Sequence, residues 1–152
     1  MNNKFHLIDH PLLKHKLSFL REESTSSAEF RNIVAEMSRL IAYEATRELP
    51  LKKEQIRTPM SDAEVERISD ELIVVSIMRA GNGMLDALLS MLPFARAGHI
   101  GIYREKFINN TVEYYFKLPA KYEGVDILLV DPMLASGDTA VACLDRLKQY
   151  EV

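Results

Sequence analysis

The chain has 152 residues, 47% of them hydrophobic and 27% charged, which is close to the average globular domain and leaves room for one α/β domain. A formal net charge of −3, from 19 basic and 22 acidic residues, gives no broad positive field to attract nucleic acid. The single cysteine excludes an internal disulfide, no Cys/His spacing resembles a zinc site, and neither a signal peptide nor a membrane span is apparent, so we expect a cytoplasmic protein.

Helical patterns come first along the chain. The apolar residues between positions 10 and 21 predict one or two short helices. Ser26 and Glu29 match the S-x-x-E capping box, and the apolar residues after them fall on one face of a helix that should end near Leu49-Pro50. The polar stretch 51–61 is expected to be extended or irregular chain.

Strands dominate the second half of the chain. The run 72–78 is continuously apolar apart from Ser76 and rich in β-branched residues, which is typical of a strand buried on both faces. The remaining elements are expected at 84–91 (helix), 98–104, 112–118 and 125–130 (strands) and 139–150 (helix). The turn signal Asn109-Asn110 predicts that the strands 98–104 and 112–118 pair as a hairpin.

This order of elements predicts an α/β fold with a mainly parallel sheet flanked by helices. Ligand sites in such sheets lie where the loops gather, at the carboxyl ends of the strands. Two loops are expected there, 79–83 and 131–139. Function is therefore sought in these two loops.

The loop 131–139 has the composition of an anion site. Its last amides, from Ala135 to Thr139, lie at the start of a predicted helix, where unpaired donors and the helix dipole favour a phosphate. Gly137 allows close approach of the backbone, and the hydroxyls of Ser136 and Thr139 add donors. Asp131, at the strand end, is placed to accept hydrogen bonds from sugar hydroxyls. An ordinary strand-to-helix turn capped by Asp131 explains the composition equally well.

Four ordered segments resemble the uracil phosphoribosyltransferases, a branch of the type I phosphoribosyltransferases. They are IMRAGNGM at 77–84, AGHIGIYR at 97–104, VEYYFKLP at 112–119 and VDPMLASGDT at 130–139, with HPL at 10–12 as a weaker fifth. The resemblance covers essentially the whole chain. It implies a type I phosphoribosyltransferase-like single domain over 1–152, with an N-terminal helical and extended region at 1–60 and a protruding hairpin arm at 98–118.

The resemblance also implies which residues act. Arg79, Arg104 and Asp131 correspond to the catalytic positions. The residues implied to bind phosphoribosyl pyrophosphate are Arg79, Ala80, Gly81, Arg104, Asp131, Pro132, Met133, Leu134, Ala135, Ser136, Gly137, Asp138 and Thr139.

By this resemblance, the two arginines are expected to meet the pyrophosphate in different ways. The guanidinium of Arg79 fits a forked pair of phosphate oxygens, and the Gly81 region offers amides to the same anion. Arg104 reaches over the pyrophosphate from the arm and shields the site from water. Without the family, Arg79 would be assigned to a surface ion pair and Arg104 to solvent.

The implied reaction transfers ribosyl phosphate from phosphoribosyl pyrophosphate to uracil and gives UMP and diphosphate, a step of pyrimidine salvage. Mg²⁺ is expected to be carried by the substrate oxygens, without an assigned protein ligand. The family further implies a homodimer or a dimer of dimers, and GTP activates some relatives. Two alternatives stay open: a non-catalytic regulatory protein that binds phosphoribosyl pyrophosphate, and a transferase for another base. The lack of G-x-x-x-x-G-K-[ST] argues against a nucleoside triphosphatase.

Other conspicuous side chains are assigned to packing. His99 stands beside a glycine at a strand start, and Cys143 lies in the middle of a predicted helix. Tyr114, Tyr115 and Phe116 fit hairpin packing or a dimer contact better than a stacking platform for a base. None of these residues is expected to take part in chemistry.

The chain departs from the family pattern in the loops and at its end. Asn82, Ser136 and Asp138 differ from the commoner residues, and the Asp138 side chain is expected to point away from the phosphate. Family members continue past Val152 with further strands and a glycine-rich loop that recognises uracil, so no uracil-binding residue is assigned in this chain. We therefore expect an incomplete sheet with an unpaired edge beside 125–130, in a fragment or a naturally shortened relative whose own activity is open.

Overall fold

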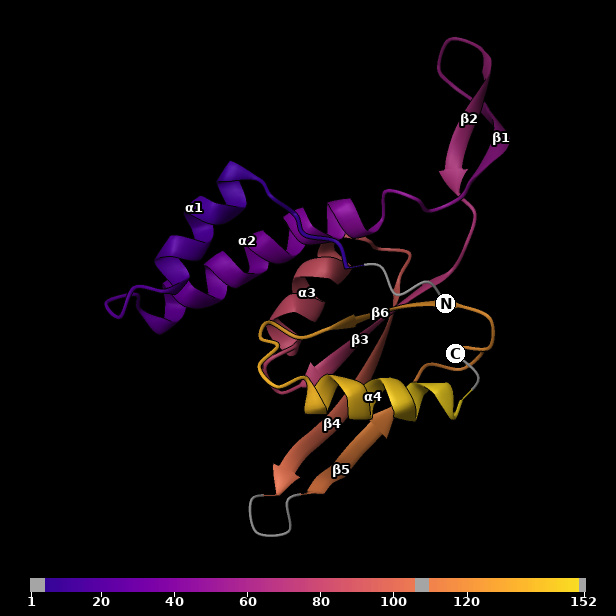
Figure 1. The fold of residues 1–152 in the computed structure, drawn as a ribbon. Coiled ribbons are helices and arrows are strands. Elements are labelled where there is room, and N and C mark those ends of the chain that lie inside the picture. Colours follow the sequence, from indigo (N-terminus) through magenta and orange to yellow (C-terminus); the bar gives the residue numbers. More distant parts are fainter. Residues whose placement is uncertain (1–4, 106–109, 151–152) are drawn as a thin grey trace.

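The computed structural model of the protein describes residues 5–105 and 110–150. Within them the chain forms four helices and six strands (Figure 1). Their bounds are α1 Pro11–Leu20, α2 Ser27–Ala45, β1 Leu51–Arg57, β2 Asp62–Ile68, β3 Leu72–Met78, α3 Asn82–Met91, β4 Arg96–Glu105, β5 Asn110–Lys117, β6 Asp126–Val130 and α4 Asp138–Lys148.

The larger sheet has four strands in the order β5-β4-β3-β6. β3 is parallel to both β4 and β6, and β5 runs antiparallel to β4. Because β3 has a strand on each side and helices on both faces, its residues 72 to 77 are all buried. The predicted α/β fold and its central buried strand are confirmed.

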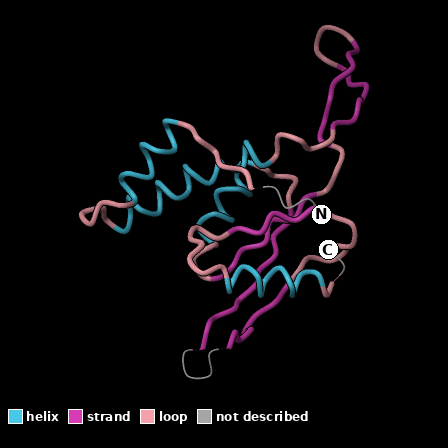
Figure 2. Tube along the Cα trace, viewed as in Figure 1, coloured by secondary structure: helices cyan, strands magenta, loops and turns pink. Residues whose placement is uncertain are grey.

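Side chains of β3 alternate between two hydrophobic clusters, one on each face of the sheet. The cluster toward α4 contains Ile73, Val75, Ile77, Ile100, Ile102, Cys143 and Leu147. The cluster toward α2 and α3 contains Ala42, Val74, Leu85, Leu88 and Val130. The sheet is thus covered by α4 on one face and by α3 and α2 on the other, as the trace in Figure 2 shows. This layering holds the carboxyl ends of the parallel strands in fixed positions.

The start of α2 follows the predicted capping box. The Glu29 amide donates to Ser26 Oγ at 3.3 Å, and the Ser26 amide donates to the Glu29 carboxylate at 3.0 Å. Such a cap contributes about 1 kcal/mol to helix stability. The beginning of this helix could therefore be located from local sequence alone.

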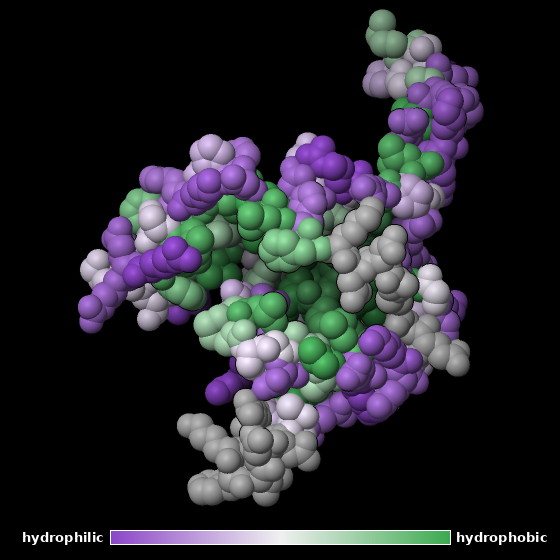
Figure 3. All heavy atoms as spheres, in the orientation of Figure 1, coloured by the Kyte–Doolittle hydropathy of each residue, from purple (hydrophilic) through white to green (hydrophobic). Residues whose placement is uncertain are grey.

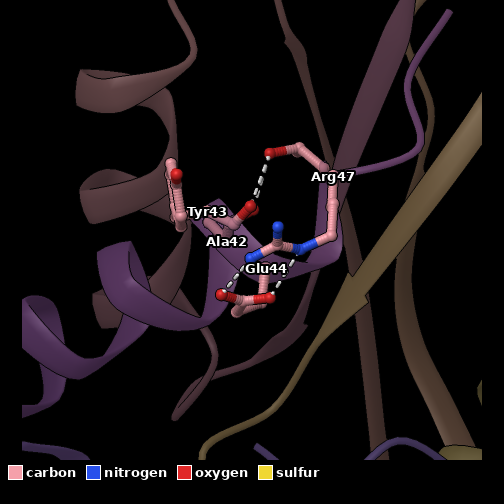
Figure 4. Close-up of polar contacts among 5 residues, drawn as sticks. Ala42, Tyr43, Glu44 and Arg47 are labelled. Carbon is pink, nitrogen blue, oxygen red and sulfur yellow. Dashed lines mark hydrogen bonds and ion pairs between the residues drawn. The ribbon is translucent and has the colours of Figure 1, made fainter. Parts of the chain in front are cut away.

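The end of α2 was not predicted correctly, because the helix stops at Ala45 and not near Leu49-Pro50. The Thr46 amide and hydroxyl both donate to the Ala42 carbonyl, at 3.0 and 2.8 Å. Next to it, Arg47 forms a two-bond ion pair with Glu44, which Figure 4 shows together with Ala42. Beyond Thr46 the backbone amides bond three residues back, as Arg47 does to Glu44 at 3.2 Å, so the α-helical pattern ends before the proline is reached.

Residues 51–68 form an antiparallel hairpin, β1–β2, where the sequence predicted only extended or irregular chain over 51–61. The hairpin is a separate two-stranded sheet that projects from the rest of the molecule (Figure 1). Cross-strand ion pairs join its strands: Lys53 to Glu64 at 2.7 Å and Arg67 to Glu54 at 3.2 Å. Because charges take the place of apolar residues in these pairs, hydrophobic alternation could not reveal the hairpin.

Beside β6, the helices α2 and α3 leave an apolar groove. Its volume is about 280 Å³, and its lining includes Ile41, Ala45, Met84 and Leu128. Figure 3 shows hydrophobic atoms at the surface in the middle of the molecule, between the N-terminal helices and α4. In the described residues β6 is an edge strand, as expected for 125–130. No helix of the described ranges is both long and apolar enough to cross a membrane.

Candidate functional site

Two loops leave the same edge of the large sheet. β3 and β6 are hydrogen-bonded parallel neighbours with Ser76 opposite Val130, so both loops start at the carboxyl edge (Figure 1). The first loop also packs on the end of β6: a Cβ added to Gly81 would lie 2.6 Å from the Val130 carbonyl oxygen. The segments after Met78 and after Val130 therefore start next to each other, at the carboxyl ends of neighbouring parallel strands.

The loop after β3 is tightly folded. The Met78–Arg79 peptide is cis, Arg79 and Ala80 are exposed, and Gly81 is buried. The Gly81 amide donates to the Ile77 carbonyl at 2.9 Å. The expectation that the Gly81 region offers amides to an anion is therefore wrong for the Gly81 amide itself, which is paired within the chain. Gly81 provides close packing, while Arg79 stays at the exposed rim.

A polar cluster lies directly below this loop. Ser76, with 0% of its surface exposed, donates from Oγ to Asn82 Oδ1 at 2.8 Å. The same hydroxyl lies 3.0 Å from His99 Nδ1 on β4. Sequence reasoning assigned His99 to structure, which the contact bears out, but it missed Ser76. The available signal was a hydroxyl in the middle of an otherwise apolar strand.

The loop after β6 is open by comparison. Residues 132–136 are exposed, with Met133 at 74% and Leu134 at 73%. Gly137 adopts φ of +88° and, as the N-cap of α4, has no side chain to cap the helix; only the Asp138 amide makes a long contact, 3.5 Å, to Ser136 Oγ. The start of α4 therefore presents backbone donors at an exposed position, which is the arrangement an anion site needs.

Ser136 has a partner inside this loop. Its hydroxyl donates to the Asp138 carboxylate at 3.0 Å. Asp138 lies in the first turn of α4, where the helix dipole favours an acid. The Ser136 hydroxyl, which we expected to donate to a phosphate, thus donates to Asp138 in this structure. It must rotate to reach a ligand.

Asp131 is half-buried at the end of β6. Burial raises the pKa of its carboxyl group, and the hydrogen bond from the Met133 amide, at 3.4 Å, lowers it only partly. Burial, followed by the charges of Asp131 and Glu113, raises the pKa of the Cys143 thiol to about 11. Cys143 is fully buried, as expected for a core residue, so its thiol stays protonated at neutral pH. The Asp131 carboxyl group is thus partly buried at the end of β6, where hydrogen-bond donors or a cation would stabilise its charged form.

The hairpin β4–β5 continues past the end of β3. Met78 pairs with Gly101, and Arg104 comes three residues later, opposite Thr111. The Arg104 side chain lies outside the described residues, as does Asn109 of the expected turn. The backbone therefore carries Arg104 beyond the carboxyl edge of β3, on the side where the loop 79–81 begins.

Tyr114 ties this hairpin to the loop after β3. A Cβ added to Gly101 would lie 2.5 Å from Tyr114 Cζ, so the ring rests on the glycine. The Tyr114 hydroxyl reaches the Met78 carbonyl at 3.4 Å. The predicted packing role of Tyr114 is confirmed, with an added contact to the residue just before Arg79.

A metal ion at this site would have few protein ligands. Among the described residues, no three His, Cys, Asp or Glu side chains gather closely enough to hold one. Asp131 supplies one carboxylate at the strand end. A Mg²⁺ that keeps most of its ligands on substrate phosphates and water fits such a donor set.

Comparisons with known proteins agree on one family. The family model for uracil phosphoribosyltransferase matches residues 7–152. A uracil phosphoribosyltransferase from Polaromonas naphthalenivorans is 49% identical over 147 residues, which are 96% of this chain and 70% of that protein. One from Delftia acidovorans is 50% identical over 145 residues, 95% of this chain and 69% of that protein. The solved structure of the AQ2163 protein from Aquifex aeolicus superposes with a TM-score of 0.86 at 31% identity, covering 93% of this chain and 68% of that one.

Proposed function

Because the chain belongs to the uracil phosphoribosyltransferase family, we propose that its two strand-end loops bind phosphoribosyl pyrophosphate for transfer of the ribosyl phosphate to uracil. The products are UMP and diphosphate, and the enzyme is a pentosyltransferase of pyrimidine salvage. The observation that carries the proposal is the backbone contact between Gly81 and Val130. It supports the proposal because one sugar can join a diphosphate in the first loop to a monophosphate in the second only if the two loops start side by side.

The monophosphate of the substrate is assigned to the loop 131–139. The exposed start of α4 supplies amide donors, and the left-handed Gly137 leaves room for a phosphate to approach them. The Ser136 and Thr139 hydroxyls add donors once the Ser136 hydroxyl turns from Asp138. Asp131 accepts hydrogen bonds from the sugar hydroxyls, which compensates the burial of its carboxylate.

The diphosphate is assigned to Arg79 and Ala80 together with Arg104, and Gly81 supports them by its close packing. Arg79 is exposed beside the packed glycine, so its guanidinium is free to pair with two phosphate oxygens. The hairpin register carries Arg104 past the end of β3, from where it covers the departing group. Both cations stabilise charge that grows on the diphosphate as the bond to the sugar carbon breaks.

The protein's part in this reaction is positioning and charge stabilisation. The sugar carbon gains oxocarbenium character as diphosphate leaves, and Asp131 orients the ring from the hydroxyl side. The hairpin excludes water that would otherwise capture the sugar. Mg²⁺, when bound, neutralises the diphosphate, with Asp131 as the residue that fits it. We further propose a cytoplasmic homo-oligomer, a dimer or tetramer, and GTP as an allosteric activator, all on the family resemblance.

Replacement of Arg79 by alanine tests the diphosphate assignment. Loss of a charge-assisted, two-bond contact should weaken binding of phosphoribosyl pyrophosphate with Mg²⁺ at least about tenfold, while thermal unfolding is unchanged. Calorimetric titration measures the affinity. Arg57→Ala, on the distant hairpin β1–β2, is the matched control and should bind like the unmodified chain. Equal affinity in a folded Arg79→Ala variant would refute the assignment.

Turnover tests the transferase activity itself. The complete product of the gene, mixed with uracil, phosphoribosyl pyrophosphate and Mg²⁺, should form UMP. The regulatory alternative predicts binding of phosphoribosyl pyrophosphate without any product, so a binding-competent protein that makes no UMP would favour it. Competition between uracil and other bases separates the remaining alternative, because a transferase for another base would select that base over uracil.

A further inference from the structure

Ser76 is a polar residue in the most buried strand of the protein. Its neighbours in β3 are apolar, and its own exposure is 0%. A hydroxyl in such a place destabilises the fold unless hydrogen bonds satisfy it. Two side chains from other elements do so: Asn82 at the first turn of α3 and His99 on β4. The cluster thus joins β3, β4 and α3 just below Arg79.

The Ser76 hydroxyl has one proton, and this determines which atoms donate and which accept in the cluster. Ser76 Oγ donates that proton to Asn82 Oδ1 at 2.8 Å. The 3.0 Å contact with His99 Nδ1 is then a hydrogen bond only if Nδ1 carries a proton and donates it to Ser76 Oγ. The result is a directed chain from His99 through Ser76 to Asn82.

We propose that Asn82 is a positioning residue for the diphosphate site, held by a hydrogen-bond chain that begins at a proton on His99 Nδ1. The proposal deepens the proposed function and rests on it, because the loop that Asn82 holds is the one assigned to the diphosphate. Asn82 touches no reacting atom in this account. It acts through the backbone of the loop that presents Arg79.

Two backbone hydrogen bonds join the start of α3, which includes Asn82, to that loop. The Asn82 amide donates to the Arg79 carbonyl at 3.3 Å, and the Leu85 amide donates to the Gly81 carbonyl at 2.9 Å. Gly81 is the N-cap of α3 and has no side chain to hold the helix start. The Asn82 side chain supplies this restraint instead, because it accepts a hydrogen bond from Ser76 in β3.

The ring of His99 reports the direction of the chain. ¹⁵N spectra of the ligand-free protein should show a proton on His99 Nδ1. In Asn82→Ala the Ser76 hydroxyl loses its acceptor and turns to His99 Nδ1, so the ring should switch to Nε2–H. Asn32→Ala, an asparagine of α2 away from the cluster, should leave the tautomer unchanged. An Nε2–H ring in the unmodified chain, or no switch in Asn82→Ala, would overturn the proposed chain.

Hydrogen exchange reports the effect on the loop. In Asn82→Ala the Gly81 and Leu85 amides should exchange about tenfold faster, because the loop opens more often when one hydrogen bond is lost. The Val141 amide, which donates to Gly137 in the other loop, is the internal control. A uniform increase at all three amides would show general destabilisation and contradict a positioning role.

The third measurement is the affinity of the variants for the substrate. With phosphoribosyl pyrophosphate and Mg²⁺ as the probe, Asn82→Ala and Ser76→Ala should each weaken affinity about tenfold, and the double variant no further, because both break one chain. Fully additive losses, or affinities equal to that of Asn32→Ala, would overturn the positioning role. If the unmodified chain fails to bind the probe, the proposed function is wrong, while the tautomer and exchange results still decide the hydrogen-bond chain.

Discussion

The loop after β3 and the loop after β6 start at the ends of adjacent strands, yet one is closely packed and the other is exposed. The first is packed so closely that Gly81 meets the backbone of Val130 and Ile77, and a hydrogen bond fixes its amide to Ile77. The second is exposed along 132–136 and turns into α4 through Gly137, with φ of +88°. One glycine is required for space and the other for backbone conformation.

This difference teaches how the two halves of a substrate would be recognised. The first loop is pre-formed by contacts to the core, so a ligand loses little free energy in ordering it. The second loop has its Ser136 hydroxyl on Asp138 and must rearrange this contact when a phosphate binds. We therefore expect changes at the packed Gly81 to act mainly on folding and changes in the second loop to act mainly on phosphate affinity.

The largest effect is expected for Gly81→Ala. The new Cβ would lie 2.6 to 2.9 Å from three backbone atoms, which cannot rotate away as a side chain can. The expected loss is about 2 kcal/mol or more in the free energy of unfolding, measured in urea. Gly83→Ala, two residues on in α3, has nothing within 4 Å and should be neutral or slightly stabilising. Similar unfolding curves for the two variants would show that the first loop is not held by close packing.

Gly137→Ala should have a smaller effect on folding and a clear one on binding. Alanine at a φ of +88° costs about 1 to 2 kcal/mol, although the nearest atom to its Cβ is the Leu134 side chain at 3.9 Å. Gly124→Ala, at φ of +70° and in open space, carries the same kind of strain away from the site. Both variants should lose similar stability, and Gly137→Ala alone should lose affinity for ribose 5-phosphate. Equal affinities would remove Gly137 from the phosphate site.

The smallest effect on stability is expected for Asp131→Asn, and its sign is informative. Burial raises the pKa of this carboxyl in the folded state, so the folded chain binds its proton more tightly than the unfolded chain does. This contribution to the free energy of unfolding is lost as the pH rises through the folded pKa. The asparagine side chain of the variant cannot ionise. The variant should therefore be more stable than the unmodified chain at neutral pH and lose this advantage below the ordinary Asp pKa of about 4. Urea unfolding across this range measures the difference; a variant less stable at neutral pH would contradict the burial argument.

The same substitution should weaken binding of phosphoribosyl pyrophosphate about tenfold or more, because a neutral amide replaces a charged acceptor for sugar hydroxyls. Stability and affinity would then change in opposite directions at one position. That combination distinguishes a residue kept for binding from one kept for the fold.

The sequence predicted the elements whose causes are local. The strand 72–78 followed from its apolar run, and the start of α2 followed from Ser26 and Glu29. The hairpin β1–β2 was missed because ion pairs such as Lys53–Glu64 join its strands and leave no hydrophobic period. The end of α2 was missed because the backbone changes to bonds three residues back, such as Arg47 to Glu44, before the proline is reached.

For the site, local sequence and family resemblance predicted the two loops and their glycines. They could not predict what holds the loops, because the partners come from distant parts of the chain. The contact of Gly81 with Val130 needs β6 to lie beside β3, and the contact of Ser76 with His99 needs the register of β4. The Tyr114 ring on Gly101 likewise depends on how β5 pairs with β4. Such contacts follow from topology, which only the folded structure reveals.

The most direct measurement is a titration of the ¹⁵N-labelled chain with phosphoribosyl pyrophosphate and Mg²⁺, followed by amide chemical shifts in both loops. If one substrate spans the edge between β3 and β6, amides at 79–82 and at 135–139 will shift together and give the same dissociation constant. Shifts confined to one loop, or two different dissociation constants, would show that the loops do not form one site.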